Sequence, residues 1–431
     1  MASPPVFKIV PTTQRYDWGK VGLNSKVAQF AAASKIPGFT LDDQAPYAEL
    51  WMGTHPSSPS RVLGSNELLS KHLAAHPNLM GARVIQRFNA ADGNIPFLFK
   101  VLAIEKALSI QTHPDKKTAE ILHQQQPNVY KDANHKPEMA VALTPFTALC
   151  GFLPLPEIAK YLQSTPEFAS LIPDAINSEF ISLSSSATPS GPKEKAALKA
   201  VFSAVMTADA KTFKAHLRGL THRYKNGEAK DDERNVQDLV LRLNDQFPDD
   251  IGVFCAFMLN YVKLEPGEAI FLAAGEPHAY VTGDIMECMA TSDNVIRAGL
   301  TPKLRDIPNL VSGLTYQAAS PEKHLVKPTP FARASMFAST ASLYDPPVPE
   351  FSVLELKIKT GESENQPPID GPSIAIVTEG SGSVGWGSVD SDSVTLSVGD
   401  VFFIGASTEV KLCSNDRTSP LVIYRAFVVA V

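Results

Sequence analysis

The sequence has few cysteines, no long hydrophobic run and no visible leader segment. Its four cysteines are far apart in 431 residues and form no CxxC pair, so neither a disulfide framework nor a thiolate metal site is indicated. The longest apolar run, Ile251 to Leu259, is far shorter than the ~20 residues of a membrane span. No basic segment followed by an apolar stretch opens the chain. We therefore expect a cytoplasmic protein with reduced thiols.

The sequence also lacks an excess of basic residues. Lysine and arginine number 39 against 45 aspartates and glutamates, which gives a net charge of −6. Proteins that bind nucleic acid or anionic membranes carry a basic excess or a basic stripe. We therefore expect no nucleic-acid or membrane partner. An anionic small molecule remains a possible ligand, because a few local cations decide its binding.

The composition is that of a folded chain with several domains. Hydrophobic residues make up 44% and charged residues 19%, so the chain can bury sizeable cores. At roughly 100–200 residues per domain, its length indicates two to four domains. The 34 prolines and 25 glycines indicate many turns between short strands.

Strand-like and helix-like segments alternate in three blocks. Short extended segments fill residues 1–152, including 97–104 and 107–113, and strand texture returns at 252–262 and 269–272. Helical spacing of apolar residues dominates 153–250, interrupted by polar loops at 184–193 and 225–235. Strand-like segments fill the chain after about residue 330. We expect one domain from 1–152 with 251–330, a helical insert at 153–250, and a C-terminal domain at 331–431.

A weak internal repeat links the two strand-rich regions. Residues 264–272 and 396–404 share the pattern L-x-x-G-acid-apolar, as a β-barrel hairpin used twice would. Only the first copy is followed by a histidine, His278. The second copy has Ser407, Thr408 and Glu409 instead. This difference predicts one working barrel and one structural barrel.

Four side chains could bind one metal ion. Ser109, Gln111 and His113 share one face of an extended strand. Glu138 follows Pro137 and leads into an apolar run, and His278 follows a glycine turn.

Gln111, His113, Glu138 and His278 would supply an amide oxygen, two imidazoles and a carboxylate, a set that suits Zn²⁺ or another borderline divalent metal. The alternatives are a polar strand face, a structural ion pair between Lys136 and Glu138, and a hydrogen-bonded half-buried histidine.

A further dense cluster of ionisable residues runs from Glu287 through Asp293 and Arg297 to Lys303. Small and apolar residues surround these side chains, whereas a surface loop would contain more lysine and glutamate. The cluster is therefore a second candidate for chemistry.

Five motifs in this order resemble the type I mannose-6-phosphate isomerases, especially the fungal members. They are YDWGK at 16–20, PYAELWMGTHP at 46–56, QTHPDK at 111–116, NHKPEMA at 134–140 and the run 283–303. The resemblance covers nearly the whole chain. It implies a mainly β protein with two cupin (jelly-roll) barrels, the second without metal, plus an all-α insert. It also implies one Zn²⁺ per chain on Gln111, His113, Glu138 and His278, and an active-site role for Arg297.

The implied reaction interconverts mannose 6-phosphate and fructose 6-phosphate through an enediolate and supplies mannose for GDP-mannose and glycosylation. It needs a base for the carbon-bound proton, and the candidates are Glu287, Lys136 and Asp293, in that order. Arg297 stays protonated and is better suited to stabilise the enediolate or anchor sugar hydroxyls. His135 is a weaker candidate for the proton transfer that opens the sugar ring.

The phosphate needs cations and neutral donors, and the candidates are Lys100, Lys136, Lys303, Arg297 and Ser109. We expect a monomer that acts on a phosphorylated sugar. The alternatives are a cupin-type metal-dependent oxygenase and a non-catalytic sugar-binding bicupin. A facial set of two histidines and one carboxylate is typical of such oxygenases, so the fourth candidate ligand, Gln111, argues against the first.

Overall fold

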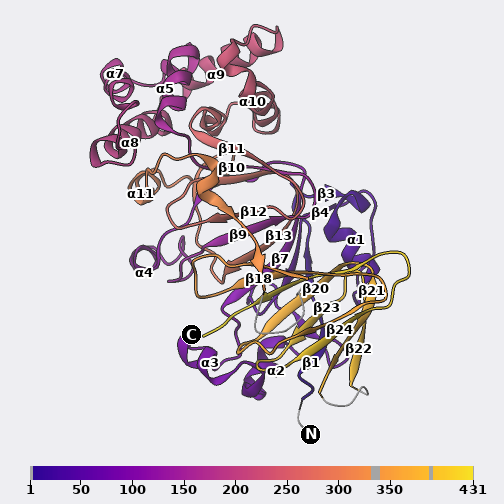
Figure 1. Ribbon diagram of the computed structural model, residues 1–431. Helices are drawn as coiled ribbons and strands as arrows, with labels where there is room; N and C mark the ends of the chain where they lie inside the picture. The colour runs from indigo at the N-terminus through magenta and orange to yellow at the C-terminus, as the bar shows by residue number, and fades with distance from the viewer. Residues whose placement is uncertain (1–2, 332–339, 388–391, 431) are drawn as a thin grey trace.

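The computed structural model describes residues 3–331, 340–387 and 392–430. It contains two β-barrels and a block of helices (Figure 1). The helical block lies at one end of the molecule, the C-terminal barrel lies at the other, and the first barrel lies between them. Within the described residues, no helix combines the length and apolar character needed to cross a membrane.

The first barrel has one large layer and one smaller layer, joined by a long strand. The large layer runs in the order β15 (Leu325–Val326), β12 (Ala269–Leu272), β9 (Glu138–Ala142), β13 (His278–Ala290), β7 (Phe97–Ile104), β5 (Glu49–Met52) and β2 (Thr12–Gln14). The smaller layer contains β8 (Ile110–Thr112), β14 (Ile296–Gly299), β10 (Phe146–Phe152) and β11 (Leu259–Leu264). The first half of β13 pairs with β8 and β10, and its second half pairs with β7 and β9.

The second barrel has the same two-layer design. Its large layer runs in the order β16 (Thr329–Pro330), β17 (Ala341–Tyr344), β18 (Ser352–Ile358), β25 (Leu421–Phe427), β20 (Ser373–Glu379), β23 (Val401–Ile404), β1 (Val6–Val10) and β6 (Arg61–Val62). Its smaller layer contains β19 (Ser363–Gln366), β24 (Val410–Ser414), β21 (Ser381–Trp386) and β22 (Ser393–Ser397). The strands expected at 373–377, 394–396, 401–404 and 421–429 are therefore present, with small shifts at their ends.

The strand nearest the N-terminus lies in the C-terminal sheet, although the sequence placed it in the first domain. β1 pairs with β23 in the register Val6 to Ile404, and the ring of Phe7 stacks on Phe403 at a centroid distance of 5.1 Å. Nothing in the local pattern of a strand names a partner almost 400 residues away. The difference therefore lies in the choice of partner and not in the strand itself.

The two barrels pack through the outer faces of their large layers. Successive strand residues point to opposite faces. Met286 and Cys288 of β13 share one buried cluster with Tyr424 and Ala426 of β25. Residues of the opposite parity fill the interior of each barrel in two separate clusters. The barrel interiors are therefore independent, and the core between them is shared.

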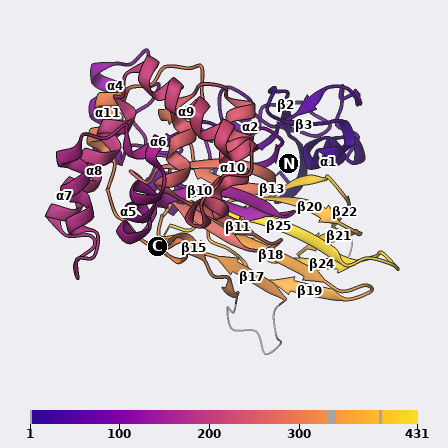
Figure 2. The ribbon, with the colours of Figure 1, turned by 90° about the horizontal axis from the view of Figure 1, so that it is seen from above.

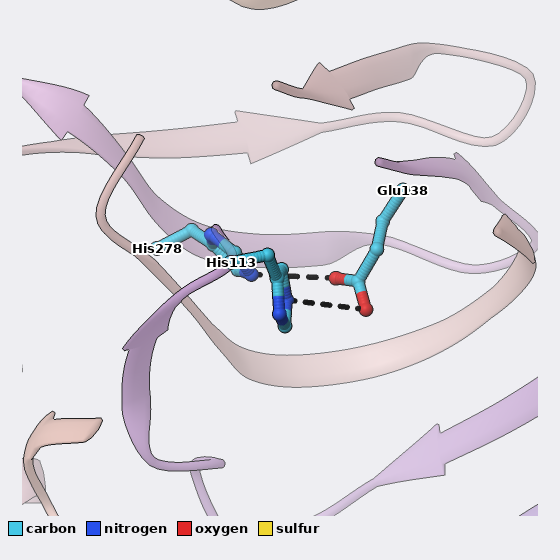
Figure 3. A group of neighbouring side chains, drawn as sticks. All are labelled: His113, Glu138 and His278. Atoms are coloured by element: carbon cyan, nitrogen blue, oxygen red, sulfur yellow. Dashed lines mark ion pairs between the residues drawn. The ribbon is translucent and has the colours of Figure 1, made fainter. Parts of the chain in front are cut away.

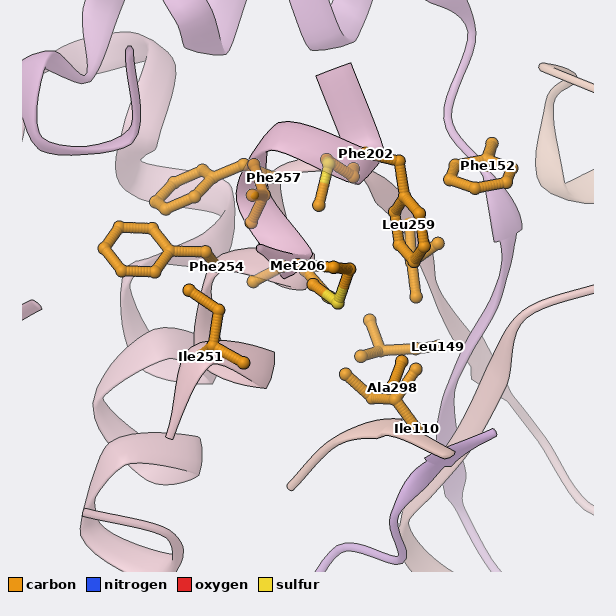
Figure 4. Close-up of a cluster of buried hydrophobic side chains, with 14 of the residues drawn as sticks. Ile110, Leu149, Phe152, Phe202, Met206, Ile251, Phe254, Phe257, Leu259 and Ala298 are labelled. Atoms are coloured by element: carbon orange, nitrogen blue, oxygen red, sulfur yellow. The ribbon is translucent and has the colours of Figure 1, made fainter. Parts of the chain in front are cut away.

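The helical insert leaves the first barrel after β10 and returns before β11. Its helices are α5 (Leu155–Ser164), α6 (Pro166–Ala169), α7 (Asp174–Leu183), α8 (Pro192–Met206), α9 (Ala210–Lys225) and α10 (Arg234–Gln246). The expected loops fall between α7 and α8 and between α9 and α10. Apolar side chains of the insert and the barrel form one core, in which Phe202 and Met206 of α8 lie near Leu149 of β10 (Figure 4). Seen from above, the helices cover one end of the first barrel (Figure 2).

The remaining elements are short. They are β3 (Lys20–Val21), β4 (Pro46–Tyr47), α1 (Lys26–Ala33), α2 (Leu69–Ala75), α3 (Ala82–Phe88), α4 (Lys116–Gln125), α11 (Ile307–Gly313) and the 3-10 turns η1 (Gly22–Asn24), η2 (Pro77–Leu79), η3 (Asp231–Glu233), η4 (Ile251–Phe257) and η5 (Pro321–His324). The strand expected from residue 252 is wrong in its first half, where η4 forms instead. All seven residues of η4 are buried, and a short apolar run buried on every side has no periodicity to separate strand from helix.

The internal repeat is confirmed as a repeated turn, but the expected hairpin is wrong: β11 pairs with β10 and β12 with β9 and β15, while β22 pairs with β21 and β23 with β1 and β20. Each turn therefore joins a strand of the smaller layer to a strand of the large layer. Gly267 and Gly399 both adopt positive φ angles, 89° and 85°. The acid after each glycine accepts a hydrogen bond from the backbone N–H three residues earlier, at 2.8 Å in both Glu268 and Asp400. The two turns are therefore equivalent, and they align β12 with β23.

Candidate metal centre and active site

Three buried side chains of the first barrel converge on one point. His113 follows β8, Glu138 opens β9 and His278 opens β13, and each is only 1% exposed. One ligand atom from each residue lies within 4.8 Å of the others. Nε2 of His113 and of His278 lies 3.4 and 3.3 Å from the carboxylate oxygens of Glu138 (Figure 3). Three segments far apart in the sequence thus form one group that could hold a metal ion.

The unused atoms of this group match the needs of a divalent cation. Nε2 of both histidines and Oε2 of Glu138 have no hydrogen-bond partner among the described residues. The other ring nitrogens are occupied: Nδ1 of His113 lies 2.7 Å from the Asn294 carbonyl oxygen, and Nδ1 of His278 lies 3.0 Å from the Glu276 carbonyl oxygen. An Nδ1–H that donates to a carbonyl leaves the Nε2 lone pair free for a metal.

The protonation states favour the same conclusion. Burial lowers the pKa of His113 to about 4, so its imidazole is neutral at neutral pH. Burial opposes ionisation of Glu138, but the Lys136 ammonium 2.8 Å away and the His113 ring hold the pKa of that carboxyl well below its usual range. A neutral imidazole and an ionised carboxylate are the metal-binding forms. The ion pair of Lys136 and Glu138 is present, and it coexists with the metal-binding geometry.

Gln111 lies opposite two other predicted site residues. It pairs with His278 on β13 and with Arg297 on β14. Side chains directly opposite each other in an antiparallel pair share one face, with Cβ atoms about 5 Å apart. Gln111, Arg297 and Ser109 line the same cavity. The amide of Gln111 is thus on the face where His278 begins.

A cavity of about 490 Å³ opens beside this group, which suits a ligand of the size of a sugar phosphate. Among the predicted site residues, nine line it: Lys100, Ser109, Gln111, Lys136, Glu138, Glu287, Asp293, Arg297 and Lys303. Five aromatic residues also line the cavity: Tyr16, Trp18, Trp51, Phe247 and Tyr280.

Lys100 is held between two carboxylates. Its Nζ lies 3.2 Å from Glu287 and 3.4 Å from Glu49. Burial opposes its charge, but the two carboxylates outweigh burial and raise the pKa of Lys100. Burial also raises the pKa of Glu287, against the effect of Lys100. Glu287 is therefore a stronger base than an ordinary carboxylate, and it faces the cavity.

Arg297 and Lys303 are the cations of the cavity with no ion pair among the described residues. Burial lowers the pKa of Arg297, yet a guanidinium stays protonated in proteins. These two side chains are therefore free to bind an anionic group of a ligand.

His135 lies away from the cavity. Its Nε2 is 2.7 Å from Oε1 of Glu350, a residue that precedes β18 of the second barrel. As the sequence suggested, Lys136 faces Glu138, on the other side of the chain. The prediction that His135 transfers a proton to the sugar ring therefore lacks the geometry that it needs, because extended neighbours point to opposite faces.

The sequence reasoning missed several residues of the cavity wall. His55 is 4% exposed, and its Nε2 lies 3.4 Å from Oδ1 of Asp293. This contact lowers the pKa of Asp293. Trp51 faces the Lys100 ammonium, with its ring centroid 4.7 Å away, and donates its indole N–H to Glu49. The motif at 46–56 contains all three of these missed residues, but only its likeness to a family had singled it out.

Asp132 joins the loop before β9 to the loop between β13 and β14. Its carboxylate accepts hydrogen bonds from the Ser292 hydroxyl at 2.8 Å, the Asp293 N–H at 2.8 Å and the Asn294 side chain at 3.2 Å. Asn294 in turn supplies the carbonyl oxygen that receives Nδ1 of His113. Asp132 therefore fixes, through Asn294, the orientation of one candidate metal ligand.

Comparison with known proteins agrees with this geometry. Models of the type I phosphomannose isomerase family match three regions: the catalytic domain over residues 6–155, the helical insertion domain over 171–259 and the C-terminal region over 341–388. The mannose-6-phosphate isomerase of Cryptococcus neoformans is 48% identical over 444 residues, covering 99% of this chain and 100% of that protein. That of Saccharomyces cerevisiae is 45% identical and covers 99% of both chains.

Solved structures give the same result. A crystal structure of a phosphomannose isomerase variant from Salmonella typhimurium matches 99% of this chain and 100% of its own, with a TM-score of 0.79 and 29% identity. A zinc-bound mannose 6-phosphate isomerase also matches at a TM-score of 0.79 and 29% identity, covering 99% of this chain and 100% of its own. The expected fold class, two cupin-like barrels with an all-α insert, is confirmed. The chain therefore belongs to the type I phosphomannose isomerase family and is an isomerase.

Proposed function

We propose that this chain interconverts mannose 6-phosphate and fructose 6-phosphate through an enediolate. The observation that carries the proposal is the buried group of His113, Glu138 and His278 beside a cavity lined by Glu287 and Arg297. Moving a proton between C1 and C2 of a sugar requires a base, a positive charge near the developing oxyanion, and a fixed phosphate. The cavity offers a candidate for each task.

Zn²⁺ would be held by Gln111, His113, Glu138 and His278, one ion per chain. When bound, it supplies Lewis-acid polarisation of the sugar carbonyl and stabilises negative charge on oxygen. Arg297 lies opposite Gln111, so its guanidinium would bind the enediolate oxygens from the neighbouring strand. Its charge is not committed to another residue among those described.

Glu287 would take the proton from one carbon and return it to the other. Its raised pKa makes it a better proton acceptor than Asp293, whose pKa is lowered by His55. Lys136 would act as a cation, since its ammonium pairs with Glu138. Lys100 would keep Glu287 ionised between turnovers, because the two side chains form an ion pair at 3.2 Å.

The phosphate would be bound by Lys303 and Ser109 at the rim of the cavity. Charge-assisted hydrogen bonds from an unpaired ammonium suit a phosphate dianion. Lys100 is a weaker candidate than the sequence suggested, since two carboxylates already share its charge.

We place the enzyme in the cytoplasm as a monomer without nucleic-acid or membrane partners, supplying mannose units for GDP-mannose and glycosylation. The proposed domains are a catalytic cupin domain (1–152 and 251–330), a helical insert (153–250) and a C-terminal cupin-like domain without metal (331–431), to whose sheet the first segment contributes β1 and β6. Neither an oxygenase nor a non-catalytic bicupin is favoured by an observation.

The test is conversion of mannose 6-phosphate to fructose 6-phosphate by the purified chain before chelation, after chelation and after addition of Zn²⁺. We expect activity to disappear with the metal and to return with zinc. Full activity in protein from which metal analysis finds the zinc removed would contradict the proposal.

A further inference from the structure

The second barrel repeats the site of the first, position by position. Strands β23, β20, β25 and β18 follow the same order as β12, β9, β13 and β7. The alignment of residues 264–272 with 396–404 around the repeated turn makes Leu272 equivalent to Ile404. Glu138 pairs with Leu272 in the first barrel, and Ser373 pairs with Ile404 in the second. Ser373 therefore occupies the position of Glu138.

The same register identifies the residue of the second barrel that is equivalent to Glu287. Ala140 and Ala375 each lie two residues beyond the position just matched. Glu287 pairs with Ala140 across β13 and β9, and Arg425 pairs with Ala375 across β25 and β20. Arg425 therefore occupies the position of Glu287, the carboxylate that faces the cavity in the first barrel.

The small layers add two further matches. Gln111 pairs with His278 in the first barrel, and Gln366 pairs with Val410 in the second. The constant spacing of the repeat makes His278 equivalent to Val410. The second barrel thus retains the amide but replaces an imidazole with an apolar side chain. Its version of the site has lost a metal-binding carboxylate and imidazole and has gained a cation.

Arg425 is buried and incompletely paired. It is 2% exposed, and its parity on β25 directs it into the barrel interior with Ile423 and Phe427. Nη2 donates to Oγ of Ser373 at 2.9 Å, whereas Nε and Nη1 have no hydrogen-bond partner in the part of the chain that the structure describes. Burial lowers its pKa to about 9, so the guanidinium is still charged at neutral pH.

An uncompensated charge in an apolar interior is unfavourable unless an opposite charge accompanies it. Leu354, Ala375 and Phe402, which line the same interior, are completely buried and apolar. The free N–H groups therefore have no acceptor among the described residues, and complete burial favours a small one. The Ser373 hydroxyl accepts from Nη2 and still has an O–H to donate.

We propose that the interior of the second barrel binds one monatomic anion of chloride size, held by one free N–H of Arg425, on Nε or on Nη1, and by the hydroxyl of Ser373. The two barrels then bind ions of opposite charge at equivalent positions. The anion neutralises Arg425 and thereby stabilises the C-terminal barrel, without contact with the sugar substrate.

The direct test uses crystals of the unmodified protein grown in chloride-free buffer and soaked in sodium bromide. An anomalous bromide peak within hydrogen-bond distance of Arg425 is the expected result. A water molecule at that place with no bromide peak would overturn the proposal, whatever happens to the variants.

A solution test compares the thermal unfolding temperature in chloride and in gluconate at equal ionic strength. Ligands that bind only the folded state raise this temperature. We expect chloride to raise it for the unmodified protein and for Arg417→Met, an exposed control in the same barrel. Arg425→Met should abolish the chloride effect, and Ser373→Ala should raise several-fold the chloride concentration that gives half of it. An equal chloride response in Arg425→Met and the unmodified protein would contradict an anion at this position.

Discussion

The two barrels have the same strand order, the same register and the same glycine turn, yet only the first gathers metal-binding side chains among the described residues. In the first barrel, Glu138 and His278 begin the strands that form the site. In the second, the equivalent positions hold Ser373 and Val410. The comparison teaches that the sheet supplies positions and directions, while a few side chains decide which ion those positions suit.

The largest effect should come from the histidine that has an apolar counterpart. His278→Ala removes one ligand of the proposed zinc ion and one of the contacts of Glu138, so we expect loss of zinc and a fall in kcat of about 10³-fold or more. Val410→Ala, the equivalent change in the second barrel, should leave zinc content and kcat unchanged. Metal analysis with steady-state assays measures both. If the His278→Ala variant retained zinc and full activity, His278 would not be a required metal ligand, and the proposed difference between the two barrels would be wrong.

The next contrast is between Glu287 and Arg425. Glu287→Gln removes the proposed base and should lower kcat by about 10²–10⁴-fold, whereas Arg425→Met should not change kcat. Because burial raises the pKa of Glu287, its base form is lost as pH falls through a value above the ordinary carboxyl range. The acidic limb of the kcat profile should therefore begin above that range, and Glu287→Gln should lack this limb. An unaltered limb in the variant would assign the proton transfer to another residue.

A smaller effect should follow from loosening the support of His113. Asp132→Ala removes the acceptor that holds Ser292 and the Asp293 backbone, so the Asn294 carbonyl loses its fixed place. Partners that orient a metal ligand typically contribute about 10–100-fold in metal affinity. We expect zinc to dissociate more readily at unchanged thermal stability of the chelated protein. Asp416→Ala, in a turn of the second barrel, is the control. A purely structural role would instead lower the stability of the chelated protein.

The smallest expected effects concern Gly267 and Gly399 in the repeated turn, and they fall on the free energy of unfolding and not on activity. Both have positive φ, so an alanine at either position costs about 1 kcal/mol or more. A Cβ on Gly399 would also lie 2.1 Å from the Phe30 carbonyl oxygen, whereas a Cβ on Gly267 would meet nothing closer than 3.9 Å. Gly399→Ala should therefore lower the free energy of unfolding more than Gly267→Ala. Equal losses in denaturant titrations would contradict the close approach of the Phe30 carbonyl oxygen to Gly399.

Much of this contrast could be predicted from the sequence because it depends on short-range rules. Alternation along a strand places Ser109 and Gln111 on one face, and both line the cavity. The same rule separates His135 from Lys136. The repeat at 264–272 and 396–404 correctly identified two equivalent turns, although their flanking strands do not pair as hairpins. Strand alternation and turn motifs depend only on residues close together in the sequence, so they can be recognised without knowing the fold.

Features that depend on distant segments could not be predicted in this way. The contact of His55 with Asp293 and the role of Asp132 arise where loops more than 150 residues apart meet. No periodicity encodes such a meeting. The ion pair of His135 with Glu350 likewise joins the first barrel to the second. The placement of His135 away from the cavity therefore has a long-range cause.

The pairing of β1 with β23 has a consequence for how the molecule is made. Val6 is synthesised almost 400 residues before its partner Ile404. Until then the edge of that early strand has no neighbour from the C-terminal sheet, and contacts of such sequence separation form slowly. The C-terminal barrel therefore cannot be completed until β23 and β25 have been synthesised, whereas the strands of the first barrel all lie within residues 12–326. A nascent chain must keep β1 available until those later strands are made.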